Sequence, residues 1–165
     1  MTKNWENRSV ITSNLLNPAF CGEIIRRTIV SFNDNEKGVK FPFVLSFLIL
    51  PIVLHKRTRK KMPMSSRTYF HSWVEENEHL FIGFAQRTRQ MIPFTRESMS
   101  FLMLQKTMTI EDDGVISVPK YRKVVPTGEF TEEINEIYKK AELLGKWLRL
   151  TGNPQTIFMF LKIRP

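Results

Sequence analysis

The longest apolar segment of the 165-residue chain runs from Phe41 to Leu54 and contains Ser46 as its one polar side chain. A segment without a polar face cannot lie against water without exposing a large apolar area, so it is predicted to be the central, buried helix. It is too short to span a bilayer, which needs roughly 20 apolar residues, and no membrane association is expected. Pro51 lacks an amide hydrogen and restricts Leu50, which predicts a kink or a break there.

A strongly basic run, KRTRKK at residues 56–61, follows this apolar segment directly after His55. Burying unpaired cations is costly, so all five cations of the run are expected to face outward. The chain has a net charge of +9, and residues 56–106 hold ten basic and four acidic side chains, a net charge of +6. Such a surface favours nucleic acid or an acidic protein partner, although a merely solvated surface is the alternative. The candidate binding residues are Lys56, Arg57, Arg59, Lys60, Lys61, Arg87, Arg89 and Arg96.

Apolar residues recur at three- and four-residue intervals along most of the remaining chain, which is typical of amphipathic helices. Asn17-Pro18 and Asn153-Pro154 are helix-start signals, because the asparagine can cap the first turn and proline is tolerated at its first position. Pro93 is expected to close one helix and Thr95 to cap the next. The predicted helices cover residues 18–32, 67–76, 78–91, 96–106, 132–151 and 154–161.

A change of period follows the helix predicted at residues 96–106. Residues 108–111 and 115–118 are short β-prone runs, and Asp113-Gly114 between them indicates a hairpin. Three short helices followed by a hairpin are typical of a winged helix, predicted here over about residues 67–118. The predicted fold is mainly α with a small β-hairpin, a winged-helix-like core flanked by helices at about 18–61 and 129–161. The chain, 42% hydrophobic, most simply forms one domain, residues 1–165.

Side chains that could carry catalysis or hold a metal form no recognisable motif. His55, His71 and His79 lack the spacing of metal ligands, Cys21 has no base near it in sequence, and there is no glycine-rich phosphate loop. We therefore expect no catalysis, no metal and no cofactor. A single unpaired cysteine and an N-terminus without an apolar signal segment favour a cytoplasmic location.

The predicted recognition helix, residues 96–106, is poorly equipped to read DNA. Groove reading requires several polar side chains that reach base edges, whereas this helix offers a carboxylate at Glu97 and short serines. The acidic hairpin tip at residues 111–113 would repel phosphates. The winged helix is therefore interpreted as a scaffold for protein interaction, and the basic run as a sequence-independent contact with strong salt dependence.

Several short motifs follow one another along nearly the whole chain: Asn17–Cys21, Leu50–Lys56, Ile82–Arg87, Pro93–Glu97, Asp113-Gly114, Gly145–Trp147 and Ile163–Pro165. In this order they resemble the small middle component of bacterial three-component ABC systems. The resemblance implies a non-catalytic subunit encoded between an SMC-like ABC ATPase and a larger effector, in gene clusters proposed to act against phage or plasmids. Gln105–Thr107 departs from the family pattern, in which a glycine follows the recognition-like helix.

Three functions remain open from the sequence. The first is an adaptor that binds the ATPase and the effector of its own gene cluster, with non-specific DNA contact and homo-oligomerisation both possible. The alternative is a winged-helix DNA-binding protein or regulator, motivated by the hairpin pattern and the net charge of +9. An enzyme is the third, motivated only by His55 and by the acidic cluster at Glu75, Glu76 and Glu78.

Overall fold

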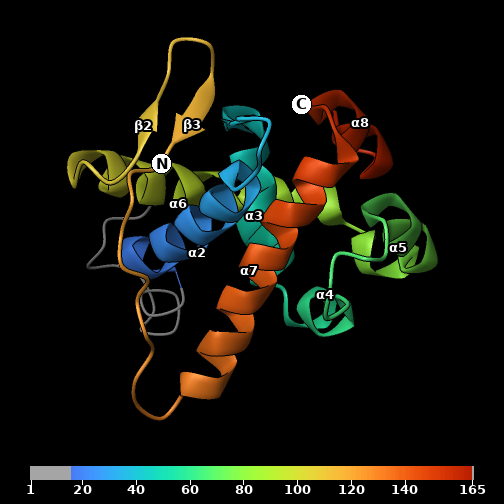
Figure 1. Cartoon of the computed structure of the whole chain (residues 1–165). Coiled ribbons are helices and arrows are strands. Elements are labelled where there is room, and N and C mark those ends of the chain that lie inside the picture. Colours follow the sequence, from blue (N-terminus) through green and yellow to red (C-terminus); the bar gives the residue numbers. More distant parts are fainter. Residues whose placement is uncertain (1–15, 165) are drawn as a thin grey trace.

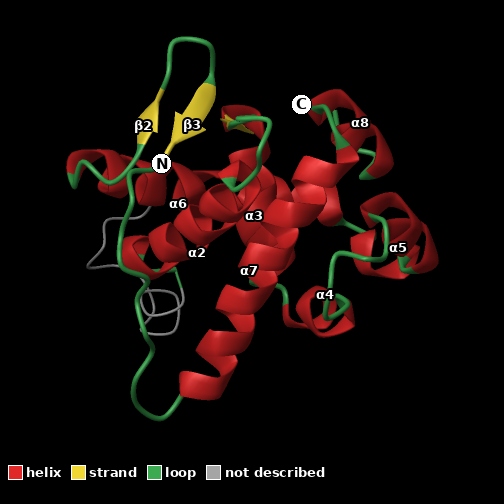
Figure 2. Cartoon of the chain, in the orientation of Figure 1, coloured by secondary structure: helices red, strands yellow, loops and turns green. Residues whose placement is uncertain are grey.

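The computed structural model describes residues 16–164 and is mainly helical, as predicted, with a small antiparallel sheet (Figures 1 and 2). The polar N-terminus and Pro165 of the last motif lie outside the described residues. The α-helices are α2 (Pro18–Asn33), α3 (Ser46–Val53), α4 (Lys56–Lys61), α5 (Phe70–Glu76), α6 (Phe84–Leu104), α7 (Thr131–Thr151) and α8 (Pro154–Phe160). The 3₁₀ helices are η2 (Phe43–Leu45) and η3 (Glu78–Phe81), and the strands are β1 (Phe41–Pro42), β2 (Thr109–Ile110) and β3 (Val115–Ser117).

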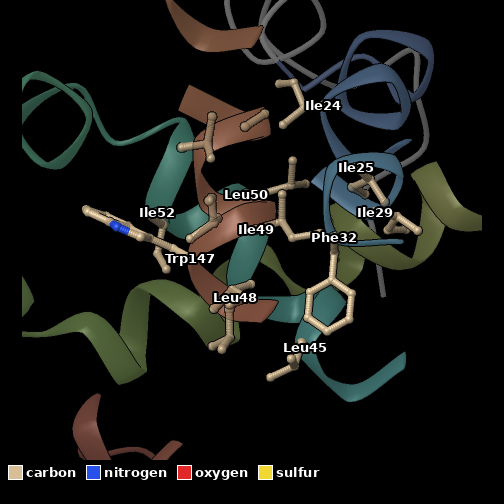
Figure 3. Packing of buried hydrophobic residues seen from close by; sticks show 14 of the residues in the cluster. Ile24, Ile25, Ile29, Phe32, Leu45, Leu48, Ile49, Leu50, Ile52 and Trp147 are labelled. Carbon is tan, nitrogen blue, oxygen red and sulfur yellow. The ribbon is translucent and has the colours of Figure 1, made fainter. Parts of the chain in front are cut away.

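Helix α3 lies at the centre of the core, as its uninterrupted apolar sequence predicted. It contacts α2, α6 and α7, and its buried side chains meet those of α2 and α7 in Figure 3. A kink or a break was predicted at Pro51, and the break is wrong, because α3 continues through Pro51 to Val53 and the chain leaves the helix at Leu54 and His55. Pro51 removes one backbone donor, but the Leu54 amide still donates to the Leu50 carbonyl at 2.9 Å. Burial on several sides holds this short helix in place despite the missing bond.

The prediction of two separate helices at residues 78–91 and 96–106 is wrong, because one helix covers most of both ranges. Residues 78–81 form η3, and α6 runs unbroken from Phe84 to Leu104 with Pro93 inside it. Thr95, predicted to cap a new helix, is fully buried within α6. An interior proline costs about 3 kcal/mol in an isolated helix. Here α6 packs along both α2 and α3, and that burial outweighs the local penalty.

The predicted hairpin is present but is part of a three-stranded sheet with the order β1-β3-β2. Strand β3 pairs with β2 through Thr109↔Ser117 and with β1 through Phe41↔Ile116. The first residues of the apolar segment are therefore strand instead of helix. Because two of the predicted helices are one, the structure does not confirm a winged helix.

Both predicted Asn-Pro helix starts are confirmed. The Asn17 side chain accepts hydrogen bonds from the first turn of α2, and the Asn153 side chain accepts one from the Thr156 amide at 2.9 Å in α8. The end of α6 is less usual, because Lys106 adopts a left-handed backbone with φ of 55°. The Thr107 amide donates to the Leu102 carbonyl at 2.9 Å, the pattern of a helix end that normally has glycine at this point. Lys106 thus takes the left-handed conformation that favours glycine.

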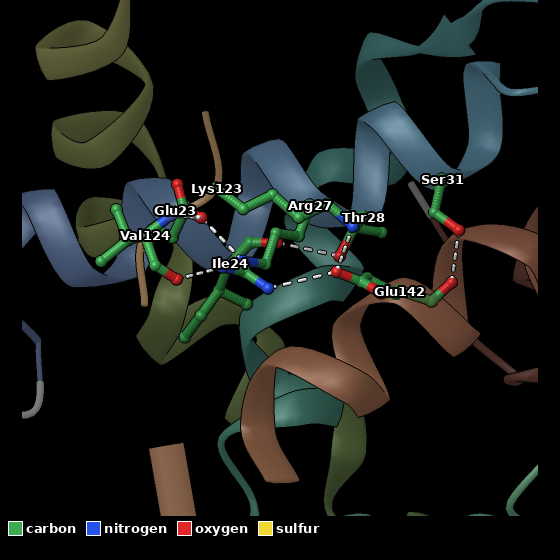
Figure 4. Close-up of polar contacts among 8 residues, drawn as sticks. All are labelled: Glu23, Ile24, Arg27, Thr28, Ser31, Lys123, Val124 and Glu142. Carbon is green, nitrogen blue, oxygen red and sulfur yellow. Dashed lines mark hydrogen bonds and ion pairs between the residues drawn. The ribbon is translucent and has the colours of Figure 1, made fainter. Parts of the chain in front are cut away.

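Helices from the two ends of the chain, α2 and α7, make the most extensive helix pair of the fold. They approach closely at Gly145, where an added Cβ would lie 2.2 Å from the Thr28 carbonyl oxygen. A polar network beside this contact links the helices to the segment before α7 (Figure 4). Arg27 pairs with Glu23 at 2.7 Å and with Glu142 at 3.2 Å, and also donates to the Val124 carbonyl.

Candidate partner-binding site

Helix α4 carries the basic run, and its position is set by side chains at its start. His55 precedes the helix and its Nδ1 accepts from the Thr58 hydroxyl at 2.7 Å and, more weakly, from the Thr58 amide at 3.4 Å. Burial, followed by the positive charges of Arg87, Arg57 and Arg59, lowers the pKa of His55 below its ordinary value of 6.5. The imidazole is therefore neutral at pH 7, which is the form that can accept these hydrogen bonds.

Arg59 is buried, and the prediction that it faces outward is wrong. Only 2% of the residue is exposed, and its guanidinium donates to the Val53 carbonyl at 3.1 Å. It also pairs with Glu133 of α7 at 2.9 Å and lies 3.7 Å from Glu136. The last carbonyls of α3 have no partner inside their helix, and Arg59 supplies one while it ties α4 to α7.

The other four cations of α4 are exposed, as predicted: Lys56, Arg57, Lys60 and Lys61. Lys56 lies 3.9 Å from the Glu133 carboxylate, a long contact between two exposed side chains that contributes little. Trp73 and Lys140 hold the end of α4 in place by donating to the Lys61 and Met62 carbonyls at 2.9 and 2.8 Å. Helix α4 therefore presents its outward charges from a well-anchored backbone.

The three arginines predicted on later helices do not form one surface with α4. Arg87 is half-buried beside His55, whereas Arg89 and Arg96 are exposed. At about 100° per residue, Arg89 and Arg96 lie roughly opposite Arg87 around α6 and within about 20° of each other. The structure thus brings Arg87 to the α4 cations and places Arg89 and Arg96 on another face.

An apolar groove of about 920 Å³ lies beside the start of α4. Its walls come from the start of α2, the end of α3, α4 itself, the middle of α6 and the start of α7, the helix end seen at the bottom of Figure 1. Charged or titratable groups line one part of it: His55, Lys56, Arg59, Arg87 and Glu133. The apolar lining is Leu16, Phe20, Leu50, Pro51, Leu54, Met91, Phe130, Ile134 and Ile137.

The sequence reasoning missed this groove. The available signal was the spacing of Phe130 and Ile134, which places two large apolar residues on one side at the start of α7. In the structure Phe130 is 66% exposed. Ile134 lies on the apolar face of α7, yet it is only half-buried and lines the groove. Periodicity identifies the apolar face of a helix, but it does not show whether another element of the same chain covers that face.

Comparison with models of known protein families shows to which family the chain belongs. A family model described as "ABC-three component (ABC-3C) system Middle Component 3" matches residues 5–165. The chain belongs to this family. The resemblance inferred from the order of its motifs is thereby confirmed. No match was found among curated proteins or among solved structures.

As a member of the Middle Component 3 family, the chain is one subunit of a multi-component system, which implies that it has partner proteins. The same membership distinguishes it from the ATPase subunit of that system. Over residues 16–164, no three histidine, cysteine or acidic side chains are grouped so that they could hold a metal ion. No helix within the same range is both long and apolar enough to cross a membrane. Cys21 is buried, and burial raises its thiol pKa from 9.0 to about 12, which disfavours the reactive thiolate.

Proposed function

We propose that this Middle Component 3 chain is a non-catalytic adaptor that acts in the cytoplasm and bridges the SMC-like ABC ATPase and the effector of its own system. We also propose that the system acts in defence against phage or plasmids. Family membership supports the role of one subunit among several. The observation that carries a binding role is the anchored basic helix α4 beside an open apolar groove. A surface with both characters suits a protein partner better than a small polar substrate.

Assembly is tested by co-expression of the three components followed by affinity purification and size-exclusion chromatography. The wild-type chain is expected to co-elute with both the ATPase and the effector. A chain that remains free of both at micromolar concentration would contradict the adaptor role. Light scattering on the purified chain alone measures whether it also forms a homo-oligomer.

The contribution of α4 is tested by reversing its charge. The triple variant Lys56→Glu, Arg57→Glu and Lys60→Glu is expected to keep the fold, because all three side chains are exposed, and to weaken assembly at least tenfold. The matched control reverses three exposed lysines elsewhere, Lys37, Lys120 and Lys146, and changes net charge equally. If both triple variants weaken assembly equally, the effect comes from overall charge and not from the position of α4. No weakening by either would remove α4 from the interface.

DNA contact is a second candidate, favoured by one specific observation. Arg89 and Arg96 are exposed on one face of α6, separate from the groove, and could follow a phosphate backbone without competing with a partner there. We expect weak, sequence-independent binding whose logarithmic affinity falls linearly with the logarithm of salt concentration, with a slope near −0.9 per phosphate contacted. Fluorescence anisotropy with random duplexes measures the slope. Tight binding to one sequence at moderate salt would instead favour the regulator.

A further inference from the structure

The groove contains a cation that the described part of the chain does not neutralise. Arg87 projects from α6, and its guanidinium donates to the Leu80 carbonyl at 3.3 Å. Its Nε is buried without a hydrogen-bond partner, and no carboxylate in residues 16–164 lies within ion-pair distance of it. Arg59, which lines the same groove, is paired with Glu133 at 2.9 Å. The two arginines therefore differ: one is already neutralised and the other is not.

Leaving Arg87 in this state has a cost that an incoming carboxylate would remove. Burial lowers the pKa of Arg87, which reflects how poorly its charge is solvated. Its guanidinium carbon lies 5.0 Å from the centre of the Phe84 ring, a contact that offers only weak compensation. A charge-assisted hydrogen bond is roughly twice as strong as a neutral one, and it is strengthened where water is excluded. An acidic group is therefore the complementary partner for this part of the groove.

The rest of the groove is apolar, so the same ligand needs apolar side chains that pack against this lining. Phe130 forms part of the wall and is 66% exposed, so a ligand that covers it gains a large buried area. The exposed cations of α4 continue the positive surface beyond the groove. A ligand that covers the apolar lining, pairs with Arg87 and also reaches the exposed cations of α4 needs apolar and acidic groups spaced along its length, which a polypeptide segment can supply.

The backbone of that segment must satisfy its own hydrogen bonds. The walls of the groove are helices and their ends, and the strands β1, β2 and β3 contribute no lining residue. An extended segment would find no strand edge to pair with and would leave polar backbone groups unpaired against apolar walls. A helix bonds internally and can place an apolar face in a groove, which is a common mode of peptide recognition.

We propose that the groove binds an amphipathic helix of a partner subunit, with aliphatic or aromatic side chains against Phe130, Met91 and Ile134 and a carboxylate that pairs with Arg87. Acidic residues flanking that helix meet the exposed cations of α4. This inference rests on the proposed adaptor function, since it names the contact by which one partner is held.

Two variants test the site, each with a matched control. Phe130→Ser removes an exposed anchor, and Leu104→Ser removes a residue that is 81% exposed but does not line the groove. Arg87→Met keeps an unbranched, flexible side chain but removes its charge, and Arg122→Met makes the same change at an exposed arginine that does not line the groove. Binding of the purified ATPase and the purified effector is measured separately for each full-length variant by biolayer interferometry.

We expect Phe130→Ser and Arg87→Met each to weaken one of the two partners at least tenfold, with both controls within twofold of wild type. Hydrogen exchange on the weakened partner should protect one segment with apolar residues at i, i+3 or i+4 and i+7 and an acidic residue between them.

The outcomes separate the inference from the function on which it rests. If wild type binds a partner and both groove variants bind equally well, the groove proposal fails while the adaptor function stands. If wild type binds neither partner, the adaptor function fails and the groove proposal fails with it. Self-association lost in Phe130→Ser, with partner binding unchanged, would make a second copy the occupant. Partner binding that appears only after Val10→Asp and Ile11→Asp would make residues 1–15 of the chain itself the occupant. Either result overturns the proposal.

Discussion

The close approach of α2 and α7 at Gly145 gives a quantitative prediction for Gly145→Ala. An added Cβ would lie 2.2 Å from the Thr28 carbonyl oxygen and 3.0 Å from the Phe32 amide nitrogen, both of them backbone atoms. The shortest ordinary C···O contacts are about 3.3 Å, so the helices must separate locally by about 1 Å. Such a shift also breaks the 2.7 Å hydrogen bond from the Ser31 hydroxyl to the Glu142 carbonyl.

The expected free-energy change follows from three contributions. Overpacking against atoms that cannot rotate away costs about 3 kcal/mol, the upper end of the usual range. The lost hydrogen bond costs about 1 kcal/mol, and the higher helix propensity of alanine returns about 1 kcal/mol. Gly145→Ala should therefore lower the free energy of unfolding by about 3 kcal/mol and the melting temperature by roughly 6–12 °C in a chain of this length.

Gly22→Ala in α2 is the matched control. Its added Cβ would lie 3.1 Å from Cδ2 and 3.3 Å from Cγ of Leu102, both side-chain atoms, so a shift of a few tenths of an ångström relieves the contact. The propensity gain of about 1 kcal/mol should offset this crowding, so the variant is expected within about 0.5 kcal/mol of wild type or slightly above it. Urea unfolding followed by tryptophan fluorescence and circular dichroism measures both variants. If Gly145→Ala is as stable as Gly22→Ala, the helices are not held apart by backbone contact and the reasoning is refuted.

Three further predictions concern stability. Lys106→Gly should raise the free energy of unfolding by about 0.5–1 kcal/mol in thermal unfolding, because it relieves the left-handed φ of 55°. Lys139→Gly, at an exposed position inside α7, should instead lower it by about 1 kcal/mol. Arg59→Ala should lower the free energy of unfolding in urea by about 3 kcal/mol, since it leaves a cavity and unpaired carbonyls. Glu133→Gln, at the exposed end of the same ion pair, should lower it by less than about 1 kcal/mol. Equal losses would contradict the difference expected between the buried and the exposed partner. The pKa of Cys21 is raised from 9.0 to about 12, so the thiol ionises at lower pH in the unfolded chain than in the folded one. The free energy of unfolding therefore falls as the pH rises from 9 to 12, by at most about 1.4 kcal/mol per pH unit. Cys21→Ala should show a smaller fall than wild type between about pH 8.5 and 10.5.

The features that the sequence predicted well depend on short-range chemistry. Asn17 and Asn153 cap helices because a side-chain oxygen reaches amides two or three residues away. Asp113-Gly114 makes a hairpin because Gly114 adopts a positive φ of 77°. Helix α3 is buried because its own sequence leaves no polar face. Each of these signals is complete within a few residues, so no knowledge of the fold is needed to interpret it.

The features that it missed depend on partners that lie far along the chain. Arg59 is buried because Glu133, 74 residues later, neutralises it. Pro93 stays inside a helix because α6 packs on α2 and α3, a benefit that local propensity does not include. The groove exists because five separate helices leave an apolar space between them. Such facts follow from the packed arrangement, and a single sequence with its local rules does not contain them.

The pairing of α2 with α7 also determines when the protein can mature on the ribosome. Translation of the 98 residues between the end of α3 at Val53 and the end of α7 at Thr151 takes roughly 5–20 s at 5–20 residues per second. During that interval the apolar surfaces of α2 and α3 lack the helix that covers them. We therefore expect the nascent chain to expose apolar surface until its last helices emerge, and a premature stop before Thr131 to produce an aggregation-prone fragment instead of a smaller folded protein.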